Sequence, residues 1–576
     1  MTAALRVLRR TAAPDHHLPA SLHPVLQRVL AARGVRSVAE LDTSLSGLLR
    51  PEGLSQIGRA VALLAQAIAA QRRICIVADY DADGATSCAL GLRALRALGA
   101  RHVDFLVPNR FEYGYGLTPP IVELALTRGA EVLVTVDNGI ASCEGVAAAK
   151  AAGLAVLVTD HHLPGAELPL ADAIVNPNLP GDGFASKALA GVGVMFYVLV
   201  ALRAHLREAG WFASQALPEP NLAAWLDLVA LGTVADVAVL DANNRRLVAQ
   251  GLARLRSGRG TPGLVALCRA SGREPGRLQA SDLGFRLGPR LNAAGRLADM
   301  ALGIELLTSD DAAACERMAR ELDAMNLERR EIEAEMKSRA LAIVEHLPRD
   351  EAAALPSGIC LFDPGWHQGV TGIVASRVKE LHHRPTVVFA RAGDTELKGS
   401  ARSIPGIHIR DVLEQVATRH PGLITRFGGH AMAAGLALEA PALARFGAAF
   451  AAEIERVAAP ELLERVLFTD GELAPADFSL ALARQLREAG PWGQGFPEPL
   501  FDGTFAVTTR RVVGEQHLKL QLSDGGRIAL DAIAFNAAQA AWARPGARIH
   551  AVFRLDINEW QGAESLQLVI EHGSAA

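Results

Sequence analysis

The chain has 576 residues, of which 21% are charged and 50% are hydrophobic, and its formal net charge is −4. These proportions are typical of a folded globular protein and exclude a disordered or fibrous chain. The near-neutral charge excludes a globally basic nucleic-acid coat but not a local basic path, and at ~150 residues per domain the length predicts three or four domains.

The cysteines and the apolar runs indicate an intracellular protein. None of the six cysteines forms a CxxC pair, which argues against a zinc knuckle or a disulfide framework and fits a reducing compartment. The N-terminal sequence MTAALRVLRRTAAPDHH lacks the apolar core of a signal peptide. The longest uncharged apolar run, 188–202, is shorter than the ~20 residues that span a bilayer, and it predicts a buried helix. We therefore expect a cytoplasmic protein that does not enter a membrane.

The sequence of the first half of the chain predicts short helices, followed by strands that alternate with helices. Residues 22–70 predict short helices. Three β-rich apolar runs then stop abruptly at acidic residues, at 74–84 (ICIVADYDADG), 132–139 (VLVTVDNG) and 155–162 (AVLVTDHH). Sequence of helical character follows each run. This alternation predicts a parallel sheet covered on both faces, and ligands of such sheets bind outside the carboxyl ends of the strands.

A long charged helix is predicted in the middle of the chain. Residues 311–346 contain neither proline nor glycine, and a continuous helix of this length would reach ~50 Å, enough to join two lobes. Apolar residues three or four positions apart predict one buried stripe along it. The stripe consists of Met318, Leu322, Met325, Ile332, Met336 and Ile343.

Two further domains follow this helix. Residues 347–460 mix strands with helices and glycine-rich turns, which predicts a smaller α/β domain. From about residue 500, alternating strands with DG and GG turns predict a small antiparallel barrel. The predicted domains are therefore an N-terminal helical segment with the parallel-sheet domain (1–310), the connecting helix (311–346), the smaller α/β domain (347–460) and the barrel domain (461–576).

Acidic residues gather at the predicted strand ends. Asp79, Asp81 and Asp83 alternate in DYDADGAT, so a chain that stayed extended would direct all three side chains to one side. Gly84 permits a tight turn into the next helix. A solitary Asp-x-Asp is as typical of a solvated acidic turn as of a site. Here further polar residues accompany it at the other strand ends and in one apolar segment: Asp137, Asp160, His161, His162 and Asp236.

This set of side chains predicts a metal centre. Carboxylates with an imidazole suit Mn²⁺ or Mg²⁺ better than a thiolate-bound metal. Several carboxylates close together repel one another unless cations neutralise them. Carboxylates on neighbouring strand ends can bridge two ions ~3.5–4 Å apart, which activate a water and stabilise the leaving oxygen of an in-line phosphoryl displacement. The residues alone therefore predict a two-metal phosphodiester or phosphoanhydride hydrolase.

Eight ordered motifs resemble those of the DHH phosphoesterase superfamily, and of its single-strand-specific 5′→3′ exonuclease branch in particular. Asp160-His161-His162 matches the tripeptide after which the superfamily is named. The manganese pyrophosphatases of the superfamily carry a histidine where this chain has Val77, which favours the nuclease branch. The motifs run from about residue 70 toward the C-terminus: DYDADGAT, TVDNG, TDHH, GTVADV, LGPRLNAAGRL, WHQGVTGIVASR, KGSARS and FGGHAMAAG.

The resemblance implies the residues of the catalytic centre. It assigns two Mn²⁺ or Mg²⁺ ions to this protein, with Asp137 as the bridge between them. The implied metal ligands are Asp79, Asp81, Asp83, Asp137, His161 and Asp236, among which Asp79 either binds metal or supports the ligands. The implied catalytic residues are Asp137, Asp160 and His162, and His162 would position or protonate the reacting phosphate.

The resemblance also implies where the DNA backbone binds. Arginine and backbone amides are frequent phosphate partners. The candidates within the motifs, and beside them at VPNRFEYGYG, are Arg110, Arg290, Asn292, Arg296, Ser400, Arg402, Gly429 and His430. Ser400 and Arg402 are expected to bind the 5′ end, which would explain exonuclease rather than endonuclease cleavage. His430 would either contact the substrate or brace its own turn.

The implied protein is an α/β enzyme. A parallel-sheet DHH domain is joined by the long helix to a smaller α/β DHH-associated domain, and a β-barrel resembling an oligonucleotide-binding (OB) fold follows. The implied activity is hydrolysis of single-stranded DNA from the 5′ end to mononucleotides, in DNA recombination and repair. The expected protein is a monomer that works with a helicase and single-strand-binding protein. The 5′→3′ polarity rests on the resemblance alone.

Three other functions stay open on the sequence. A cyclic-dinucleotide or nanoRNA phosphodiesterase of the same superfamily would leave the barrel unexplained. A non-catalytic scaffold would have lost acidic ligands, and every expected acid is present. A protein that only binds single-stranded nucleic acid would need no domain other than the barrel.

Overall fold

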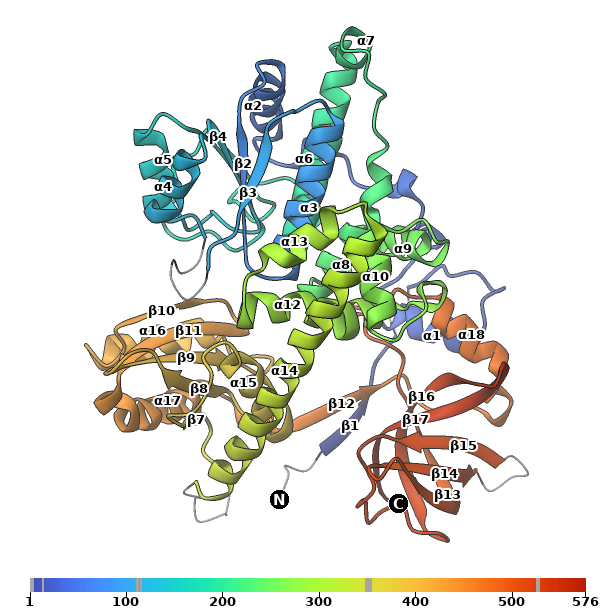
Figure 1. The fold of residues 1–576 in the computed structure, drawn as a ribbon. Coiled ribbons are helices and arrows are strands. Elements are labelled where there is room, and N and C mark those ends of the chain that lie inside the picture. Colours follow the sequence, from blue (N-terminus) through green and yellow to red (C-terminus); the bar gives the residue numbers. More distant parts are fainter. Residues whose placement is uncertain (1–4, 13–14, 110–112, 114–115, 348–354, 525–528) are drawn as a thin grey trace. The chain divides into compact units, whose positions relative to one another are not determined.

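The computed structural model describes residues 5–12, 15–109, 113, 116–347, 355–524 and 529–576 (Figure 1). The chain forms two compact units, and each is described by itself. The larger unit comprises Val7–Leu291, Met300–Ala319 and Phe468–Ala576, and the smaller unit comprises Met1–Arg6, Asn292–Asp299 and Arg320–Leu467.

The larger unit contains the predicted parallel sheet. Its spatial order is β3-β2-β4-β5-β6, and all neighbouring strands are parallel. Every residue of β2 and β4 is buried, which is why these strands read as continuous apolar runs. The strands are β2 (Ile74–Ala78), β3 (Val103–Leu106), β4 (Val132–Val136), β5 (Ala155–Thr159) and β6 (Ala173–Val175).

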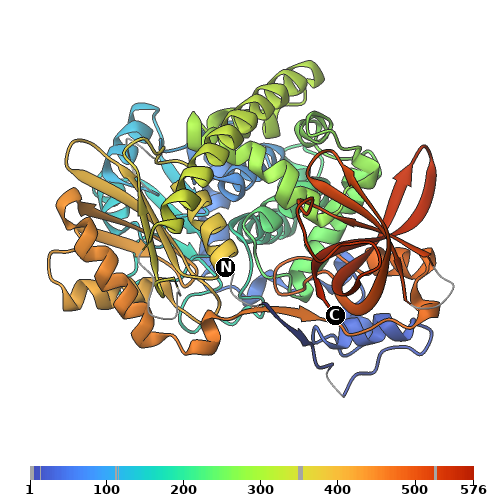
Figure 2. The same cartoon turned by 90° about the horizontal axis from the view of Figure 1, so that it is seen from below.

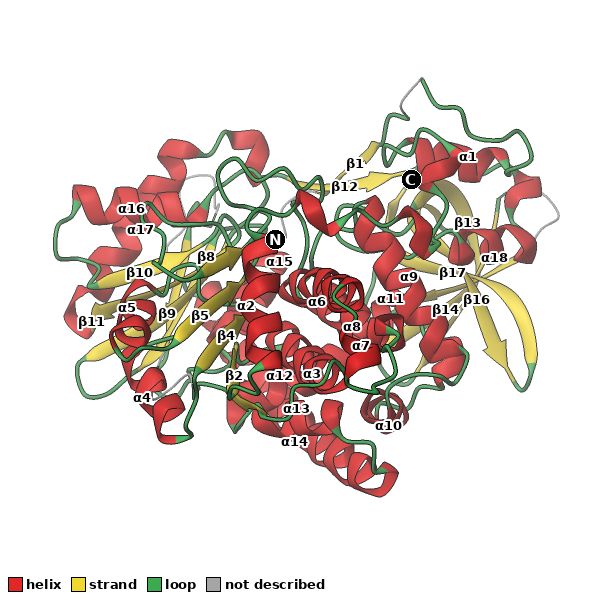
Figure 3. Cartoon of the chain, turned by 90° about the horizontal axis from the view of Figure 1, so that it is seen from above, coloured by secondary structure: helices red, strands yellow, loops and turns green. Residues whose placement is uncertain are grey.

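Helices cover both faces of this sheet, as predicted (Figure 3). Val77 and Leu133 pack with α4 (Pro119–Thr127) and α5 (Cys143–Ala151) on one face. Ile76 points to the other face, where α3 (Ala82–Ala97) and α6 (Gly191–Glu208) lie: a Cβ on Gly91 of α3 would come within 2.8 Å of the Ile76 Cδ1. The apolar run 188–202 is thus largely the buried helix α6.

Further helices of the larger unit precede or follow the parallel sheet in the sequence. They are α1 (Pro24–Ala31), α2 (Ile57–Ala69), α7 (Trp211–Ser214), α8 (Leu226–Ala235), α9 (Ala242–Arg256), α10 (Pro262–Ala270), α11 (Ala280–Asp282), the π-helix η6 (Leu283–Leu287) and α13 (Ala301–Thr308). Two helices run from the larger unit into the smaller one: α12 (Gly288–Leu297) and α14 (Ala312–Glu345).

The helix α14 is continuous, as predicted, but its buried stripe differs from the predicted one. Leu322 and Met336 are buried, whereas the other predicted members are only half-buried. The stripe also contains Asn326 and Arg329, which the sequence pattern did not include. The guanidinium of Arg329 donates to Asn326 Oδ1 at 2.8 Å and to Glu333 Oε2 at 2.5 Å, so these polar groups are buried with partners.

The smaller unit is a second α/β layer structure. Its sheet has the order β10-β11-β9-β8-β7, with β7 and β8 parallel and the other pairs antiparallel. The helices α16 (Ile409–Arg419) and α17 (Leu443–Val457) pack on one face, and α14 and α15 (Thr371–His382) pack on the other. The strands are β7 (Ile359–Phe362), β8 (Thr386–Arg391), β9 (Glu396–Arg402), β10 (Arg426–Gly429) and β11 (Ala433–Glu439).

The C-terminal region of the larger unit is a closed barrel of order β13-β14-β15-β17-β16 (Figure 2). Four of its strand pairs are antiparallel, as predicted, and β15 pairs with β17 in parallel. The strands are β13 (Phe501–Val513), β14 (His517–Ser523), β15 (Ala529–Ala534), β16 (Arg548–Trp560) and β17 (Ala563–Ala575), preceded by α18 (Leu480–Glu488).

A separate two-stranded sheet consists of β1 (Leu5–Arg9) and β12 (Arg465–Thr469). Across the described ranges we find no helix with the length and apolarity to cross a membrane.

Candidate metal centre

Neighbouring strands of the parallel sheet end in acidic residues at the same level. Ala78 of β2 is aligned with Val136 of β4, and Val136 is aligned with Thr159 of β5. The backbone ladder continues one residue further, because the N–H of Asp79 donates to the Val136 carbonyl at 3.3 Å and the N–H of Asp137 donates to the Thr159 carbonyl at 3.1 Å. The backbone therefore holds Asp79 and Asp137 next to each other at the carboxyl edge.

A tight turn joins β2 to α3. Asp81 caps α3, and its carboxylate accepts hydrogen bonds from the N–H groups of Asp83 (2.9 Å) and Gly84 (3.0 Å). A Cβ at Gly84 would lie 2.4 Å from the carbonyl oxygen of Asp79, so the turn requires glycine. The extended conformation that would direct all three aspartates to one side ends at this cap. Asp83 lies instead in the first turn of the helix.

The start of α6 anchors Asp83. The buried Asp83 carboxylate accepts hydrogen bonds from the N–H groups of Gly191 (2.6 Å) and Val192 (3.0 Å), the first residues of a helix, where backbone donors favour an anion. A Cβ on Gly191 would lie 2.6 Å from the Cβ of Asp137, so this glycine also permits the close approach of α6 to the β4 end. Sequence reasoning missed Gly191, although a glycine at the start of an apolar helix was a usable signal.

Seven side chains form three overlapping groups in which the possible ligand atoms lie within 4.8 Å of one another. His161 links the groups, because its Nε2 lies 3.0 Å from Asp137 Oδ1 and 3.8 Å from Asp236 Oδ2. The structure thus brings together all six residues that were predicted as metal ligands. The groups are Asp79 with Asp81 and Asp137, Asp83 with His161 and Asp236, and Asp137 with His161 and His162.

Ionising the carboxylates of this cluster costs free energy, so their pKa values are raised. Burial raises the pKa of Asp83 to about 7, and the negative charge of Asp236 adds to the effect. Burial and the charge of Asp81 raise the pKa of Asp236 to about 7. Burial, followed by the charge of Asp83, raises the pKa of Asp137 well above its ordinary value. A divalent cation would remove this repulsion, and oxygen ligands with one imidazole suit Mn²⁺ or Mg²⁺.

Asp160 holds His162 and stands outside the three ligand groups. Its Oδ1 lies 2.7 Å from Nδ1 of His162 and accepts the N–H of His161 at 2.7 Å, while its Oδ2 accepts the N–H of Ile140 at 2.9 Å. Burial opposes a charge on His162, but the hydrogen bond and the charge of Asp160 raise its pKa to about 9. Asp160 therefore holds the ring of His162 through Nδ1.

In the smaller unit, Ser400 and Arg402 lie beside the start of α15. The Oγ of Ser400 is 2.9 Å from Oγ1 of Thr371, the first residue of this helix. A Cβ on Gly372 would lie 2.7 Å from Nη2 of Arg402, so the guanidinium lies directly against the first turn. Ser400 and Arg402 are two positions apart on β9, so their side chains lie on the same face of the strand. Thr371 and Gly372 belong to the motif WHQGVTGIVASR, but the prediction did not single them out.

The other predicted phosphate-binding residues have structural contacts of their own. Asn292 and Arg296 lie on α12, and Nη1 of Arg296 donates to the Gly369 carbonyl at 3.0 Å within the smaller unit. In the larger unit, Nη1 of Arg290 donates to the Arg286 carbonyl at 2.7 Å. These contacts hold the two guanidinium groups in place.

His430 closes a tight turn between β10 and β11. Its N–H donates to the Ala433 carbonyl at 2.8 Å. The preceding Gly429 has φ of 143°, and a Cβ there would lie 2.4 Å from the Cα of Ala434. The backbone of His430 therefore braces the turn, one of the two roles considered for it. Arg110 lies outside the described residues.

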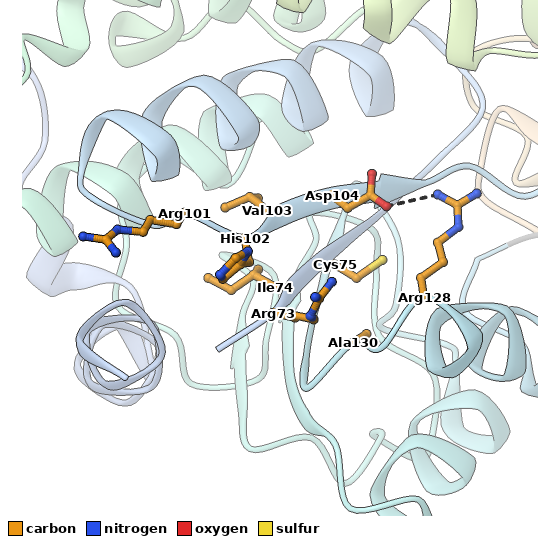
Figure 4. A pocket seen from close by; sticks show the side chains of 9 residues that line it. All are labelled: Arg73, Ile74, Cys75, Arg101, His102, Val103, Asp104, Arg128 and Ala130. Atoms are coloured by element: carbon orange, nitrogen blue, oxygen red, sulfur yellow. Dashed lines mark hydrogen bonds and ion pairs between the residues drawn. The ribbon is translucent and has the colours of Figure 1, made fainter. Parts of the chain in front are cut away.

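A pocket of about 170 Å³ lies at the opposite, amino-terminal edge of the parallel sheet (Figure 4). Ile74 and Val103 are among its apolar lining residues, and Arg73, Arg101 and Arg128 add positive charge. Figure 4 shows the Arg101 and Arg128 guanidinium groups at opposite ends of the pocket, with that of Arg73 between them, and Arg128 is paired with Asp104 at 3.3 Å. The Arg101 and Arg128 charges therefore do not converge on a common point.

Known families and solved structures are similar to this chain over nearly its whole length. Three family models match it: the DHH family N-terminal domain at 73–233, the DHHA1 domain at 355–456 and the RecJ OB domain at 469–572. These matches agree with the order and the types of the predicted folds.

Curated relatives and solved structures agree with the family models. The chain is 55% identical to the single-stranded-DNA-specific exonuclease RecJ of Dickeya dadantii over 98% of both chains, and 51% identical to that of Escherichia coli over 99% of both. The structure of RecJ from Thermus thermophilus in complex with Mn²⁺ has a TM-score of 0.81 and 31% identity, covering 99% of this chain and 80% of that one. The resemblance found in the motifs is confirmed, and the chain belongs to the RecJ family of DHH phosphoesterases.

Proposed function

We propose that this protein is a divalent-metal-dependent exonuclease that hydrolyses single-stranded DNA from the 5′ end to mononucleotides. The observation that carries the proposal is the cluster of seven ligand side chains at the carboxyl edge of the sheet. The matched relatives are named single-stranded-DNA-specific exonucleases, and Thermus thermophilus RecJ has been solved with Mn²⁺ and with Mg²⁺. The rival functions without catalysis would leave this buried acidic cluster unexplained.

Two ions fit the ligand groups. Asp79, Asp81 and Asp137 would hold one ion, and Asp83, His161 and Asp236 would hold the other, with Asp137 close enough to His161 to be common to both. When bound, such ions lower the pKa of a water nucleophile and stabilise the charge that develops on the phosphate.

The protein's own residues would orient the reaction. Asp160 keeps the Nδ1–H of His162 in place, so that Nε2 of His162 can donate a proton to a phosphate oxygen. The N-terminal amides of α6 hold Asp83 still. Ser400 and Arg402 would hold the terminal 5′ phosphate, with Thr371 fixing the hydroxyl of Ser400. Holding a chain end accounts for an exonuclease with 5′→3′ polarity.

The remaining inferences follow from the family. The predicted domains at 1–310, 347–460 and 461–576 would serve as catalytic, substrate-binding and strand-binding parts, joined through 311–346. The barrel would bind the strand through exposed residues such as Arg510, Arg511 and Phe535. The protein would act as a cytoplasmic monomer in recombination and repair, beside a helicase and single-strand-binding protein.

One assay tests the proposal. We would incubate 5′-labelled and 3′-labelled single-stranded DNA with Mn²⁺ and the wild type, the Asp137→Ala variant or the control Asp104→Ala, which removes an exposed acid at the other edge of the same sheet. The 5′ label should leave first as a mononucleotide with the wild type and the control, and stay on the DNA with Asp137→Ala. Internal cleavage, or full activity of Asp137→Ala, would contradict the proposal.

A further inference from the structure

One large aromatic side chain of the larger unit is almost fully exposed. Phe285 is 84% exposed, compared with 54% for Phe535 on the barrel. Single exposed apolar residues are common on protein surfaces, so exposure alone does not indicate a function. The backbone of Phe285, the packing beneath it and its neighbours distinguish it from such residues.

Phe285 occupies the middle of the π-helix Leu283–Leu287. The N–H of Gly288 closes this helix by donating to the carbonyl of Leu283. Such wide turns are rare and frequently occur at functional sites. Leu283 and Leu287 are fully buried, so the π-helix is fixed at both ends while Phe285 faces outward.

The π-helix packs against the end of α8 that leads to the metal centre. A Cβ on Gly284 would lie 3.2 Å from Cγ1 of Val234, and a Cβ on Gly288 would lie 3.1 Å from the Cβ of Ala235. The two glycines therefore allow the π-helix to approach the last turn of α8 closely. The next residue along the chain is Asp236, one of the proposed metal ligands. The exposed ring is thus connected to the metal centre through packed backbone.

Cationic groups accompany the exposed ring. Arg286 is exposed, and Arg290 follows one turn later, where its Nη1 is held by the Arg286 carbonyl at 2.7 Å. Grooves that bind single strands without sequence preference combine such cations, which attract the backbone, with aromatic faces on which bases stack. The ring of Phe285 provides the second of these elements next to the first.

We propose that Phe285 is a nucleobase-stacking residue, on which one base of the single strand rests while Arg290 attracts a neighbouring phosphate. The proposal rests on the proposed nuclease function and adds a named contact to it. Stacking of this kind tolerates any sequence, because every base has a π face. It also favours single strands, since the faces of a base inside a duplex are already covered by its neighbours.

The test compares Phe285→Ala and Phe285→Trp with the wild type. The control is Leu170→Ala, which removes another apolar side chain of the same unit that is 86% exposed. We would measure kcat and KM on a single-stranded oligonucleotide and on the same length of abasic strand. Phe285→Ala should raise KM on the order of tenfold on the normal strand with little change in kcat. Phe285→Trp should restore the low KM, and the control should match the wild type.

The abasic strand separates stacking from a structural role. Without bases, the wild type and Phe285→Ala should have the same KM. An equal loss on both substrates, an unchanged KM on the normal strand, or no rescue by tryptophan would overturn the stacking proposal. A wild type that degrades no single-stranded DNA would instead overturn the proposed function, so the two failures are distinguishable.

A binding measurement gives a readout that does not depend on turnover. In the Asp137→Ala background, which should leave the DNA intact, a fluorescent 2-aminopurine base placed at successive positions from the 5′ end would report stacking as quenching. We expect quenching at one position, and its loss when Phe285→Ala is added. Quenching that is unaffected by Phe285→Ala at every position would contradict the proposal.

Discussion

Two clusters of buried carboxylates in the larger unit are held in opposite ways. In the metal centre, Asp137 is surrounded by other acids, and burial with their charge raises its pKa. In the second cluster, Asp470 and Asp502 are just as buried, but each faces an arginine from the N-terminal segment. Nη1 of Arg33 lies 2.7 Å from Asp470, and Nη2 of Arg9 lies 2.7 Å from Asp502.

The carboxylates of the metal centre are suited to bind a cation from solution, whereas those of the second cluster stabilise the fold. A buried carboxylate among like charges destabilises the protein until a cation neutralises it. A buried carboxylate with a hydrogen-bonded arginine has its neutralising partner inside the chain. Removing a charge from the metal centre should therefore lower the nuclease activity without lowering the stability of the protein. Removing a charge from the arginine-paired cluster should lower the stability and leave the nuclease activity unchanged.

The largest expected effect is on catalysis by the metal centre. Asp137→Asn keeps the shape of the side chain but removes a charge that two of the three ligand groups share. We expect nuclease activity to fall on the order of a thousandfold, because loss of metal-based charge stabilisation costs several kcal/mol at the transition state. The melting temperature of the metal-free variant should equal or exceed that of the wild type, as scanning calorimetry in a chelator can show. A clear drop in the melting temperature would remove the contrast between the clusters.

The second prediction concerns the arginine-paired cluster. The side chain of Arg33 is almost fully buried, and its loss in Arg33→Ala would leave the Asp470 carboxylate buried without its main partner. The free energy of unfolding should fall by about 3–5 kcal/mol, while nuclease activity at low temperature stays close to that of the wild type. Denaturant unfolding measures this change. The control Arg128→Ala breaks an exposed pair and should cost less than about 1 kcal/mol. Equal losses in the two variants would show that burial of the pair is unimportant.

The third prediction extends the comparison to a cation proposed to serve a ligand. Gly372→Ala would place a methyl group 2.7 Å from Nη2 of Arg402 and push the guanidinium aside. Because a long side chain can move, we expect little loss of stability but an increase in KM of about tenfold, or ~1.4 kcal/mol. The matched control is Gly447→Ala in α17, where a Cβ would be 3.5 Å from its nearest neighbour. Steady-state kinetics that show the same KM for both variants would contradict a phosphate-binding role for the observed position of Arg402.

Much of this architecture could be predicted because its signals are local. Continuous apolar runs that end in acids predicted the strands, and the resulting edge brought together the six expected ligands. The grouping of the ligands could not be predicted, because the cap formed by Asp81 turns the chain before Asp83. The N–H of Gly191 donates to Asp83 from far along the sequence, and although a glycine at the start of an apolar helix is visible in the sequence, its partner is not.

The errors in the predicted elements have the same origin. The stripe of α14 was predicted from apolar residues, but Arg329 is buried there because Asn326 and Glu333 satisfy it. The barrel was predicted as antiparallel, and the parallel pairing of β15 with β17 is set by closure of the barrel. In α14 the partners lie within about one turn of Arg329, whereas in the barrel the partner strand is distant in the sequence. An apolar or alternating pattern contains neither kind of contact.

The smallest expected effect is the pH dependence of the arginine-paired cluster. Burial opposes the charge of Asp502, but the hydrogen bonds from Arg9 and Thr469 outweigh it and lower its pKa below the ordinary value of 3.8. A lowered pKa in the folded state stabilises the protein above the ordinary pKa, and this stabilisation is lost as the pH falls through the lowered value. The asparagine variant Asp502→Asn cannot titrate. The difference in unfolding free energy between wild type and variant should therefore be constant at neutral pH and shrink below about pH 4. Urea unfolding across this range measures it, with the exposed Asp104→Asn as the control. A difference that stays constant into acid would mean that Arg9 does not stabilise the Asp502 charge, and the second cluster would then resemble the first.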